Sequence, residues 1–508
     1  MGTTIALTCP QSNSSRHSPT RNSKSATGLR RSSCLLWDRC CSNVTRNNLF
    51  HLISLGCPKN RVDTERILAV LTRSGFRYTP EPREASLIIV NSCAFIEPAV
   101  EESIDVILES HCLNPLALLV VAGCLPLRYR EKLLGPLPEV DLFVGPEQIE
   151  ALPGLLDRKI GSLNRKAGRS RLKAGPQNDL TLSPRALTTR GYAYLKIAEG
   201  CSRRCRYCTI PSIRGPLRSE GFAALEQEAQ WLASSGVREL VLVAQDTSSY
   251  GQDLGEKNGL MTLLRRLELI KGVRWIRLMY LHPASIPSDL ARVMNESDII
   301  LPYLDIPLQH VADTVLRAMG RPGKGDRIRK LIDRLRNEVP NLVLRTTLMV
   351  GYPGEGEDEF GELREFVESG RVEHVGVFTY SPEEGTSAFK LGDPVSDEVK
   401  AARADEIRTI HSRIMERRNR QRVGSIEECL IEGPSEETDY LLQGRTWDQA
   451  PEVDGSFYAT SGLATAGEIH TARITETFGP DLFGELISER LTRTGNSRGR
   501  PRGREGPQ

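Results

Sequence analysis

Three cysteines lie close together in the middle of the chain, in the stretch Cys201-Ser-Arg-Arg-Cys205-Arg-Tyr-Cys208. Thiolates are soft ligands that suit iron–sulfur clusters or zinc. Structural zinc is usually closed by four Cys or His ligands, but this stretch supplies three thiols and no His. On a four-iron cube, three thiolates leave one iron open for a substrate or cofactor. The motif therefore predicts an open iron–sulfur cluster, with a chance grouping of thiols as the alternative.

Three further cysteines follow apolar runs in the first part of the chain. The runs and the cysteines after them are 50–55 with Cys57, 85–90 with Cys93, and 116–122 with Cys124. Helical stretches between the runs predict a parallel sheet flanked by helices, in which the C-terminal strand ends share one edge. A single buried cysteine is usually just a small apolar residue. Three of them at successive strand ends predict a second cluster, again with three protein ligands and one open iron.

The segment before Cys201 predicts the element that carries it. Residues 191–198 are rich in apolar and aromatic side chains, as in a buried strand, and Gly200 ends this strand. From residue 191 a strand-then-helix pattern repeats about six times, which predicts an incomplete α/β barrel with its chemistry at the C-terminal strand ends. The later strands are predicted at 239–245, 275–280, 303–306, 342–350 and 374–380. Polar or glycine-bearing segments follow several of them: Gln245-Asp246, Gln309-His310 and Gly351 to Gly354.

The pattern changes after residue 420. Short apolar runs separated by Gly, Pro and Asp predict about five strands, which suits a small OB-like barrel. RNA-binding barrels need basic grooves and aromatic platforms. This module is acidic instead, which predicts a face that docks a basic protein, with a solvated acidic surface as the alternative. Its carboxylates are Glu427, Glu428, Glu432, Glu436, Glu437, Asp439, Asp448, Glu452 and Asp454.

The overall composition places limits on function. The chain has 508 residues, a formal net charge of +2 and 39% hydrophobic residues, which supports several packed domains and gives no general signal for nucleic acid. No apolar run approaches the ~18 residues that a membrane span needs. Twelve cysteines at this length do not make a disulfide scaffold. Cluster ligands need reduced thiols, so a reducing compartment is predicted.

Both ends of the chain and one internal segment differ in composition from the rest. The first 47 residues are rich in Arg and Ser, with no acidic residue before Asp38. This predicts an organelle transit peptide, for the plastid in preference to the mitochondrion, with a disordered bacterial extension as the alternative. Residues 158–186 are polar and basic and predict a flexible linker. Residues 489–508 are basic and of low complexity, which predicts a disordered tail.

Several motifs together resemble the radical S-adenosylmethionine methylthiotransferase family. They are Ser54-Leu-Gly-Cys-Pro-Lys-Asn60, Val90-Asn-Ser-Cys-Ala-Phe-Ile96, Ala122-Gly-Cys124 and the three-cysteine motif behind them. The first of these is similar to the branch that modifies an aspartate of a ribosomal protein, whereas the tRNA-modifying branch more typically carries Gly-Cys-Gln-Met-Asn. Gly444 to Gly455 resembles the TRAM domain of the ribosomal branch. The resemblance covers the chain from about residue 49 to about residue 487.

The resemblance implies the cofactors and their ligands. In the family, a reduced [4Fe–4S] cluster cleaves S-adenosylmethionine to a 5′-deoxyadenosyl radical, which removes a substrate hydrogen. An auxiliary [4Fe–4S] site supplies sulfur, and a second S-adenosylmethionine supplies the methyl group. No catalytic residue beyond the cluster ligands is implied, and His310 would only form hydrogen bonds behind the site. The implied residues are Cys201, Cys205 and Cys208 for the radical cluster, Cys57, Cys93 and Cys124 for the auxiliary cluster, and Gln245, Asp246, Gly351 and Gly354 for S-adenosylmethionine.

The predicted function is methylthiolation of the β-carbon of an aspartate in ribosomal small-subunit protein twelve, within an organelle. The alternatives are a tRNA adenosine methylthiotransferase and a non-catalytic iron–sulfur protein, and the latter leaves the open irons unexplained. The reaction needs an electron donor and a sulfur donor, involves no membrane, and allows RNA contact without requiring it. The predicted segments are 1–47 transit peptide, 48–157 parallel α/β domain, 158–186 linker, 187–420 radical S-adenosylmethionine core, 421–488 TRAM barrel and 489–508 tail.

Overall fold

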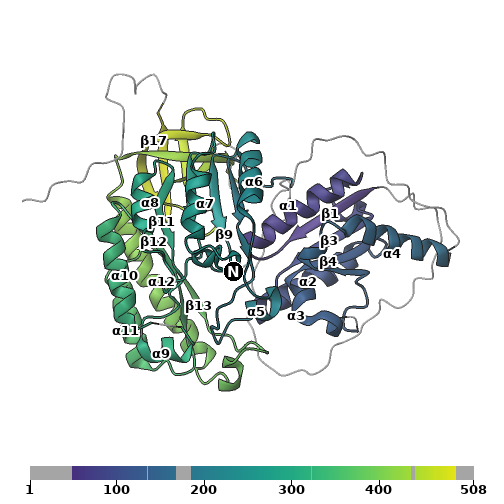
Figure 1. The fold of residues 1–508 in the computed structure, drawn as a ribbon, viewed down its shortest axis with the longest axis horizontal. Helices are drawn as coiled ribbons and strands as arrows, with labels where there is room; N and C mark the ends of the chain where they lie inside the picture. The colour runs from purple at the N-terminus through teal and green to yellow at the C-terminus, as the bar shows by residue number, and fades with distance from the viewer. Residues whose placement is uncertain (1–47, 134, 168–184, 322, 436–440, 488–508) are drawn as a thin grey trace, which may run out of the picture.

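The computed structural model describes residues 48–487, except 134, 168–184, 322 and 436–440 (Figure 1). The predicted transit peptide, most of the predicted linker and the predicted tail lie outside the described residues. The described chain forms two parallel sheets with flanking helices and one closed β-barrel, which confirms the predicted fold class. Within these ranges, no helix combines the length and the apolar character needed to pass through a lipid bilayer.

The N-terminal domain is a parallel sheet with helices on both faces. Its elements are β1 (Leu49–Ser54), α1 (Pro58–Arg73), β2 (Arg77–Tyr78), β3 (Leu87–Ser92), α2 (Glu97–Leu113), β4 (Leu118–Gly123), α3 (Cys124–Tyr129), β5 (Leu142–Val144) and α4 (Leu152–Ala167). The strand order is β2-β1-β3-β4-β5. Helices α1 and α4 pack on one face, and α2 and α3 pack on the other. Because both faces are covered, β3 and β4 read as unbroken apolar runs in the sequence.

The prediction of a linker at residues 158–186 is wrong for residues 158–167, which belong to helix α4. Leu152, Leu156 and Ile160 recur at every fourth position and are buried against the sheet. This spacing places them on one face of a helix, so residues 158–167 continue α4 instead of forming a linker. Strands β2 and β5 were not predicted, because two or three residues carry too short a pattern to be recognised.

The second domain is an incomplete barrel, as predicted. Its parallel strands are β6 (Tyr192–Lys196), β9 (Glu239–Val243), β10 (Trp275–Leu278), β11 (Ile300–Asp305), β12 (Val343–Val350) and β13 (His374–Thr379), which pair in chain order into an open sheet. Its other elements are β7 (Ala198–Glu199), α5 (Ile210–Arg214), β8 (Arg218–Ser219), α6 (Phe222–Ser234), α7 (Gly259–Leu267), α8 (Leu290–Glu296), α9 (Asp313–Ala318), α10 (Gly325–Glu338), α11 (Glu357–Glu368) and α12 (Asp397–Arg420). All six predicted strands are present.

The C-terminal domain is a small closed β-barrel, as predicted. Its strands are β14 (Ile426–Pro434), β15 (Leu442–Thr446), β16 (Phe457–Ser461), β17 (Ile469–Phe478) and β18 (Asp481–Leu486). They close in the order β14-β15-β16-β18-β17. Apolar side chains, including Ile431, Phe457 and Ile474, fill the interior. The barrel therefore has a core of its own.

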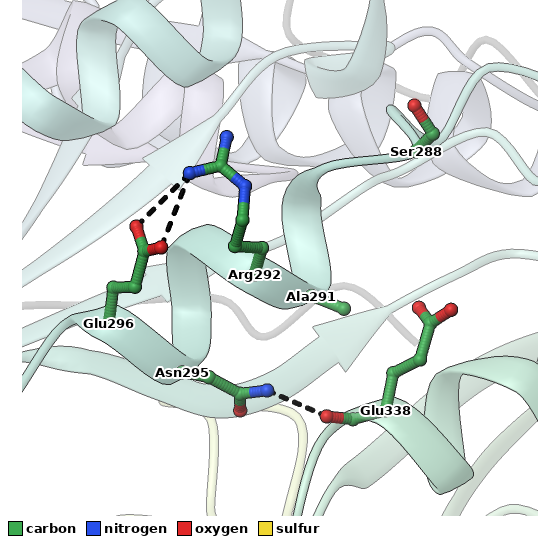
Figure 2. Close-up of a pocket in the computed structure, with 6 residues that line it drawn as sticks. All are labelled: Ser288, Ala291, Arg292, Asn295, Glu296 and Glu338. Atoms are coloured by element: carbon green, nitrogen blue, oxygen red, sulfur yellow. Dashed lines mark hydrogen bonds and ion pairs between the residues drawn. The ribbon is translucent and has the colours of Figure 1, made fainter.

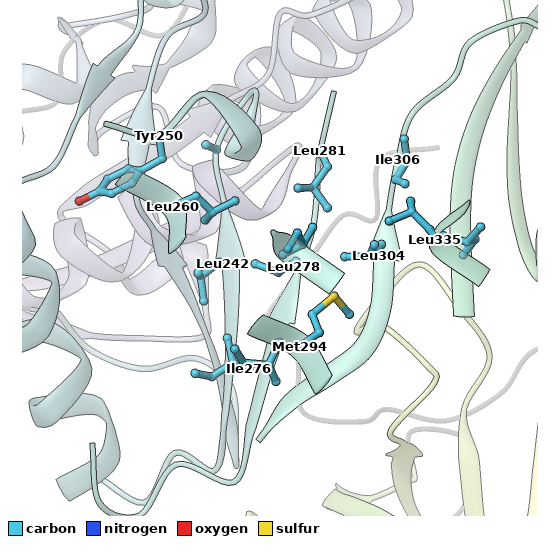
Figure 3. Packing of buried hydrophobic residues seen from close by; sticks show 14 of the residues in the cluster. Leu242, Tyr250, Leu260, Ile276, Leu278, Leu281, Met294, Leu304, Ile306 and Leu335 are labelled. Carbon is cyan, nitrogen blue, oxygen red and sulfur yellow. The ribbon is translucent and has the colours of Figure 1, made fainter. Parts of the chain in front are cut away.

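The two faces of the open sheet are covered in different ways. Helices cover the outer face, where Leu242, Ile276 and Met294 belong to one continuous apolar core (Figure 3). On the inner face, the side chain of Tyr303 packs in a cluster with Val62 of α1 and Leu430 of β14. The inner face is thus closed by the other two domains. This arrangement brings the N-terminal domain against the barrel sheet.

Candidate functional site

The structure brings the three predicted auxiliary thiols together. Cys57, Cys93 and Cys124 follow the C-terminal ends of β1, β3 and β4, which are adjacent strands of one sheet. A Cβ atom added at Gly56 would lie 3.0 Å from Cβ and 3.1 Å from Sγ of Cys93, so the first two loops touch. The three thiols also act on one another electrostatically. Residues that are far apart in sequence thus form one group.

Glycine and asparagine fix the shape of this strand edge. Gly123 has φ +91°, and an added Cβ would lie 2.5 Å from Asn91 Oδ1 and from the carbonyl oxygen of Ser92. Only glycine therefore allows α3 to start directly from β4. Asn60 Nδ2 donates to the Ser92 carbonyl at 2.9 Å, and Asn91 Nδ2 donates to the Asn60 carbonyl at 2.8 Å. These bonds lock the first turn of α1 onto β3.

Burial governs the protonation of the auxiliary thiols. It raises the pKa of Cys93 to about 12, and the neighbouring Cys124 and Cys57 raise it further. Burial also raises the pKa of Cys124, and Arg214 opposes this by donating from Nη2 to Sγ at 3.1 Å. Metal binding requires thiolates and so displaces these protons.

The three radical-motif thiols lie on the loop that follows β7. The loop carries Cys201, Cys205 and Cys208. Gly200, which opens it, has φ +74°, and an added Cβ would overlap the carbonyl oxygen of Pro216. Burial raises the pKa of Cys208 to about 12, and the Cys205 and Cys201 thiols raise it further. The three thiols predicted to bind the radical cluster are therefore also brought together.

Two arginines, Arg203 within this loop and Arg321 beside it, take part in contacts that the sequence did not indicate. Arg321 Nη1 lies 3.3 Å from the Tyr207 hydroxyl, to which it donates, and 3.8 Å from Cys205 Sγ. Arg203 Nε donates to Asp246 Oδ2 at 2.7 Å. Both guanidinium groups bring positive charge to a loop of potential thiolates. Arg321 could not be assigned from the sequence because it lies 116 residues from Cys205 along the chain.

The two groups of thiols face each other across the domain interface. Thr209, which follows Cys208, donates from Oγ1 to the carbonyl oxygen of Phe95 at 2.9 Å. Arg214 of α5 reaches Cys124 Sγ, and α5 packs against α3, between the two domains in Figure 1. The loops of the two groups are therefore in direct contact.

A buried charge network crosses the same interface. Arg214 Nη1 lies 3.2 Å from Asp63 Oδ2 and 3.3 Å from Glu199 Oε2. Lys196 Nζ lies 2.5 Å from Asp63 Oδ1 and 2.9 Å from Glu199 Oε2. Because Asp63 lies on α1 and the other three residues belong to the barrel domain, these pairs tie the two domains together beside the thiols.

Two of the residues predicted to contact S-adenosylmethionine lie beside the radical loop. Gln245 Nε2 donates to Glu199 Oε1 at 2.9 Å. The carboxylate of Asp246 accepts hydrogen bonds from Arg203, Ser248 and Ser249. Their polar groups are thus engaged with residues that surround the thiols.

The predicted glycine turn follows β12. Gly351 N donates to Glu355 Oε2 at 2.8 Å, and an added Cβ at Gly354 would meet no atom within 4 Å. Tyr352, between the two glycines, packs edge-on against Tyr207 of the radical loop, with ring centroids 6.4 Å apart. His310 is fully buried behind this turn, and its Nδ1 accepts a hydrogen bond from Ala312 N at 3.0 Å. The turn therefore lies against the thiol loop.

Within the described ranges, no three His, Cys, Asp or Glu side chains converge closely enough to hold one metal ion. Each group supplies three soft thiols, the kind of ligand that iron–sulfur clusters use.

A surface pocket of about 390 Å³ lies elsewhere in the barrel domain (Figure 2). Ser288 and four residues of α8 line it, together with Glu338 at the end of α10, whose carbonyl accepts a hydrogen bond from Asn295 at 2.7 Å. Helices α8 and α10 end where β11 and β12 begin. The pocket is therefore at the edge of the sheet opposite to the thiols and is not the candidate site.

Three of the nine carboxylates predicted to form an acidic docking face point into the protein. Asp448 pairs with Arg418 of α12 at 3.1 Å, and Asp454 pairs with Arg345 of β12 at 3.5 Å. Glu432 pairs with Arg445, which also reaches Glu239 of β9 at 2.7 Å. The prediction is wrong for these residues, because they attach the C-terminal barrel to the rest of the chain. Of the others, Glu427 pairs with Arg422, Glu428 with Arg274 and Glu452 with Arg61, while Glu436, Glu437 and Asp439 lie outside the described residues.

Comparison with known proteins identifies the family. Three family models match: "Uncharacterized protein family UPF0004" at residues 49–145, "Radical SAM superfamily" at 195–367 and "TRAM domain" at 423–487. The ribosomal protein uS12 methylthiotransferase RimO of Trichlorobacter lovleyi is 45% identical over 460 residues, covering 88% of this chain and 100% of that protein. The chain belongs to the uS12 methylthiotransferase family. The protein of the same name from Pelobacter propionicus is 44% identical over 452 residues, covering 87% of this chain and 98% of that protein.

Among solved structures, the radical S-adenosylmethionine methyltransferase TsrM from Kitasatospora setae aligns with a TM-score of 0.46 and 14% identity, covering 66% of this chain and 75% of that chain. Membership of the family confirms the predicted class of enzyme, a radical S-adenosylmethionine methylthiotransferase. The radical S-adenosylmethionine superfamily uses a [4Fe–4S] cluster together with S-adenosylmethionine.

The predicted organelle location is wrong. Eight of the most similar relatives, which are 42–45% identical to this chain, all come from bacteria. Bacteria have neither plastids nor mitochondria. The prediction rested only on the Arg- and Ser-rich composition of residues 1–47, which lie outside the described residues. Such a composition also occurs in segments that target nothing, so it does not identify a transit peptide.

Proposed function

We propose that this protein inserts sulfur and a methyl group at the β-carbon of an aspartate in ribosomal protein uS12, the small-subunit protein twelve. The observation that carries the proposal is the direct contact between the two thiol loops, with Thr209 Oγ1 at 2.9 Å from the Phe95 carbonyl oxygen. A group that starts a radical and a group that holds sulfur must both reach one carbon atom. Positioning of this kind supplies much of the rate of a two-component reaction. The names of the bacterial relatives support the choice of substrate.

The two groups of thiols would each hold a [4Fe–4S] cluster with one open iron. When bound, the clusters and S-adenosylmethionine supply a 5′-deoxyadenosyl radical on one side and sulfur on the other. The protein holds the thiols at strand ends and on one loop, shields them partly from water, and places a guanidinium donor beside Cys124 and another beside Cys205. The ligands are Cys201, Cys205 and Cys208 for the radical cluster, and Cys57, Cys93 and Cys124 for the auxiliary cluster.

The S-adenosylmethionine site would lie along the strand ends beside the radical loop. Gln245 and Asp246 are already bonded to Glu199 and Arg203, so they would act chiefly by fixing these neighbours. The turn from Gly351 to Gly354 is open at Gly354. Absence of a side chain there lets a ligand approach the backbone closely.

Anaerobic reconstitution of the purified protein with iron and sulfide tests the function. We expect about eight irons per chain, from two four-iron clusters. With a reductant, S-adenosylmethionine and either uS12 or tRNA, mass spectrometry should find a methylthio group on one aspartate of uS12 and none on tRNA. About four irons per chain would refute the second cluster. Methylthiolated adenosine would favour the tRNA-modifying alternative, and failure to consume S-adenosylmethionine would favour a non-catalytic iron–sulfur protein.

Cysteine variants test the division of labour. Cys201→Ala should abolish 5′-deoxyadenosine formation, because the radical cluster loses a ligand. Cys57→Ala should still cleave S-adenosylmethionine but should insert no sulfur. The exposed Cys112 gives a matched control, since Cys112→Ala should behave as the wild type. Methylthiolation of uS12 by Cys57→Ala would show that the assignment of the two groups is wrong.

The reaction also needs an electron donor and a sulfur donor, and contact with RNA is allowed but not required. The proposed division of the chain is a methylthiotransferase N-terminal domain at 48–157, a radical core at 187–420 and a TRAM barrel at 421–488. Helix α4 extends the N-terminal domain beyond this boundary, to residue 167.

A further inference from the structure

Lys59 is a buried cation between the auxiliary loop and the barrel domain. It lies in the first turn of α1, two residues after Cys57, and is 8% exposed. Its Nζ lies 3.7 Å from the ring centre of Tyr280, which follows β10 of the barrel domain. The side chain therefore extends from the auxiliary loop towards the strand ends of the barrel.

Lys59 has no carboxylate partner among the described residues, in contrast to other buried cations of this interface. Lys196 and Arg214 each pair with Asp63 and Glu199. Within the described part of the chain, Lys59 forms no ion pair and its Nζ has no hydrogen-bond acceptor. Lysine is almost never buried unless it is paired, because an unpaired buried charge is costly. The carboxylates of Glu199 and Asp305 act on Lys59 electrostatically without forming an ion pair with it, so this cation has no close anionic contact among the described residues.

The surroundings of Lys59 favour an anion at this place. Helix α1 begins with Pro58, has no side-chain cap and runs for 16 residues, so its N-terminus attracts negative charge. Tyr280 has φ +61°, a backbone conformation that is unusual for a residue with a side chain. Strain of this kind concentrates at functional sites. The helix N-terminus that carries Lys59 and the strained backbone of Tyr280 thus meet at the barrel side of Cys57.

We propose that Lys59 and the first turn of α1 form the subsite for the carboxylate of the aspartate that is modified. This inference rests on the proposed function, since the reacting β-carbon must lie between the two thiol groups and its carboxylate is directly attached to it. Lys59 extends from the auxiliary loop towards the strand ends of the barrel domain, so it can hold that carboxylate through a charge-assisted hydrogen bond. An adenine base carries no carboxylate and would leave the cation unpaired. Lys59 would therefore contribute to the choice of substrate.

The test measures binding by the reconstituted holoenzyme. Its dissociation constant is determined for uS12 and for uS12 whose acceptor aspartate is changed to asparagine. We expect the wild type to prefer the aspartate form by about tenfold or more, as a hydrogen bond to a charged group predicts. Lys59→Met keeps the length of the side chain but removes its charge, and should abolish this preference. Lys59→Arg should retain most of it, and Lys271→Met, at an exposed lysine, should match the wild type.

Other roles for Lys59 give different results. If Lys59 serves only to balance the charge of the auxiliary cluster, Lys59→Met will lower the iron content or change the electron paramagnetic resonance spectrum while the preference for aspartate persists. If it serves only to pack on Tyr280, the variant will melt at a lower temperature and again keep the preference. Either result overturns the proposal, as does a wild type without preference. If wild-type enzyme neither binds nor modifies uS12, the proposed function itself fails, and the subsite fails with it.

Discussion

Replacing Arg214 with glutamine tests whether the charge network between the thiol groups supports both the fold and the auxiliary site. The Arg214 side chain is 2% exposed and reaches four groups. Its Nη2 donates to Cys124 Sγ at 3.1 Å and to Asn60 Oδ1 at 2.6 Å. Its Nη1 pairs with Asp63 and Glu199. Glutamine is shorter and neutral, so it cannot satisfy these partners together.

Two losses follow from this substitution, and the structure gives their approximate size. Breaking a buried ion pair by removing one partner costs about 3–5 kcal/mol. Because Lys196 still contacts both Asp63 and Glu199, we expect the lower end of this range, about 3 kcal/mol of unfolding free energy. A hydrogen bond to a charged group is worth about 1.5–3 kcal/mol. Its loss at the Cys124 thiolate should weaken iron retention by about ten- to hundredfold.

Anaerobic urea unfolding and iron release to a chelator measure the two losses separately. Arg214→Lys keeps the charge but not the planar donor group, so it should fall between the wild type and Arg214→Gln. Arg292→Gln is the matched control, because Arg292 pairs with Glu296 at the surface and should leave both measurements unchanged. If Arg214→Gln unfolds at the wild-type urea concentration and releases iron at the wild-type rate, the network does not have the role assigned to it.

Three further changes have defined outcomes. Burial raises the pKa of Asp305 to about 6. The protonated carboxyl group therefore stabilises the fold at low pH, and this contribution is lost as the pH rises through 6. Urea titrations should show the unfolding free energy of the wild type falling by about 1 kcal/mol relative to Asp305→Asn between roughly pH 5 and pH 8. Gly200→Ala forces a side chain against the Pro216 carbonyl at φ +74°, and should cost more than about 1 kcal/mol and lower the iron content of the radical site. Arg445→Met removes the partner of Glu239 across the domain boundary and should lower the melting temperature of the holoenzyme.

Each of these expectations can fail clearly. A difference between Asp305→Asn and wild type that does not depend on pH would show that Asp305 keeps an ordinary pKa. A Gly200→Ala protein with full iron content would show that the loop can shift to accept a side chain. For Arg445, the control is Arg274→Met, since Arg274 pairs with Glu428 at the surface. Equal melting temperatures for the two variants would show that the buried pair does not hold the C-terminal barrel.

The sequence by itself determined the main strands and the thiols of both groups. Parallel strands that are buried on both faces are apolar along most of their length. A run such as ELVLV in β9 can therefore be recognised as a strand from the sequence alone. Ligands carried by one loop, as from Cys201 to Cys208, keep their spacing in any fold. The C-terminal ends of strands in a parallel sheet share an edge, and this rule is sufficient to predict that Cys57, Cys93 and Cys124 lie together. The edge strands β2 and β5 and the end of α4 were missed because their patterns were short or were masked by polar residues.

Only the tertiary structure decided which groups face one another. Thr209 and Phe95 are 114 residues apart, and Arg214 and Cys124 are 90 residues apart, so no local pattern could pair them. Composition also gives the number of charged side chains but not whether each one points to solvent or into the protein. The acidic residues of the C-terminal barrel suggested an outer face, yet Asp448 and others turn inward to arginines, because a buried carboxylate is tolerated only when it is paired. Lys59 shows the reverse case, since only the folded chain reveals a buried cation that forms no ion pair with any described residue.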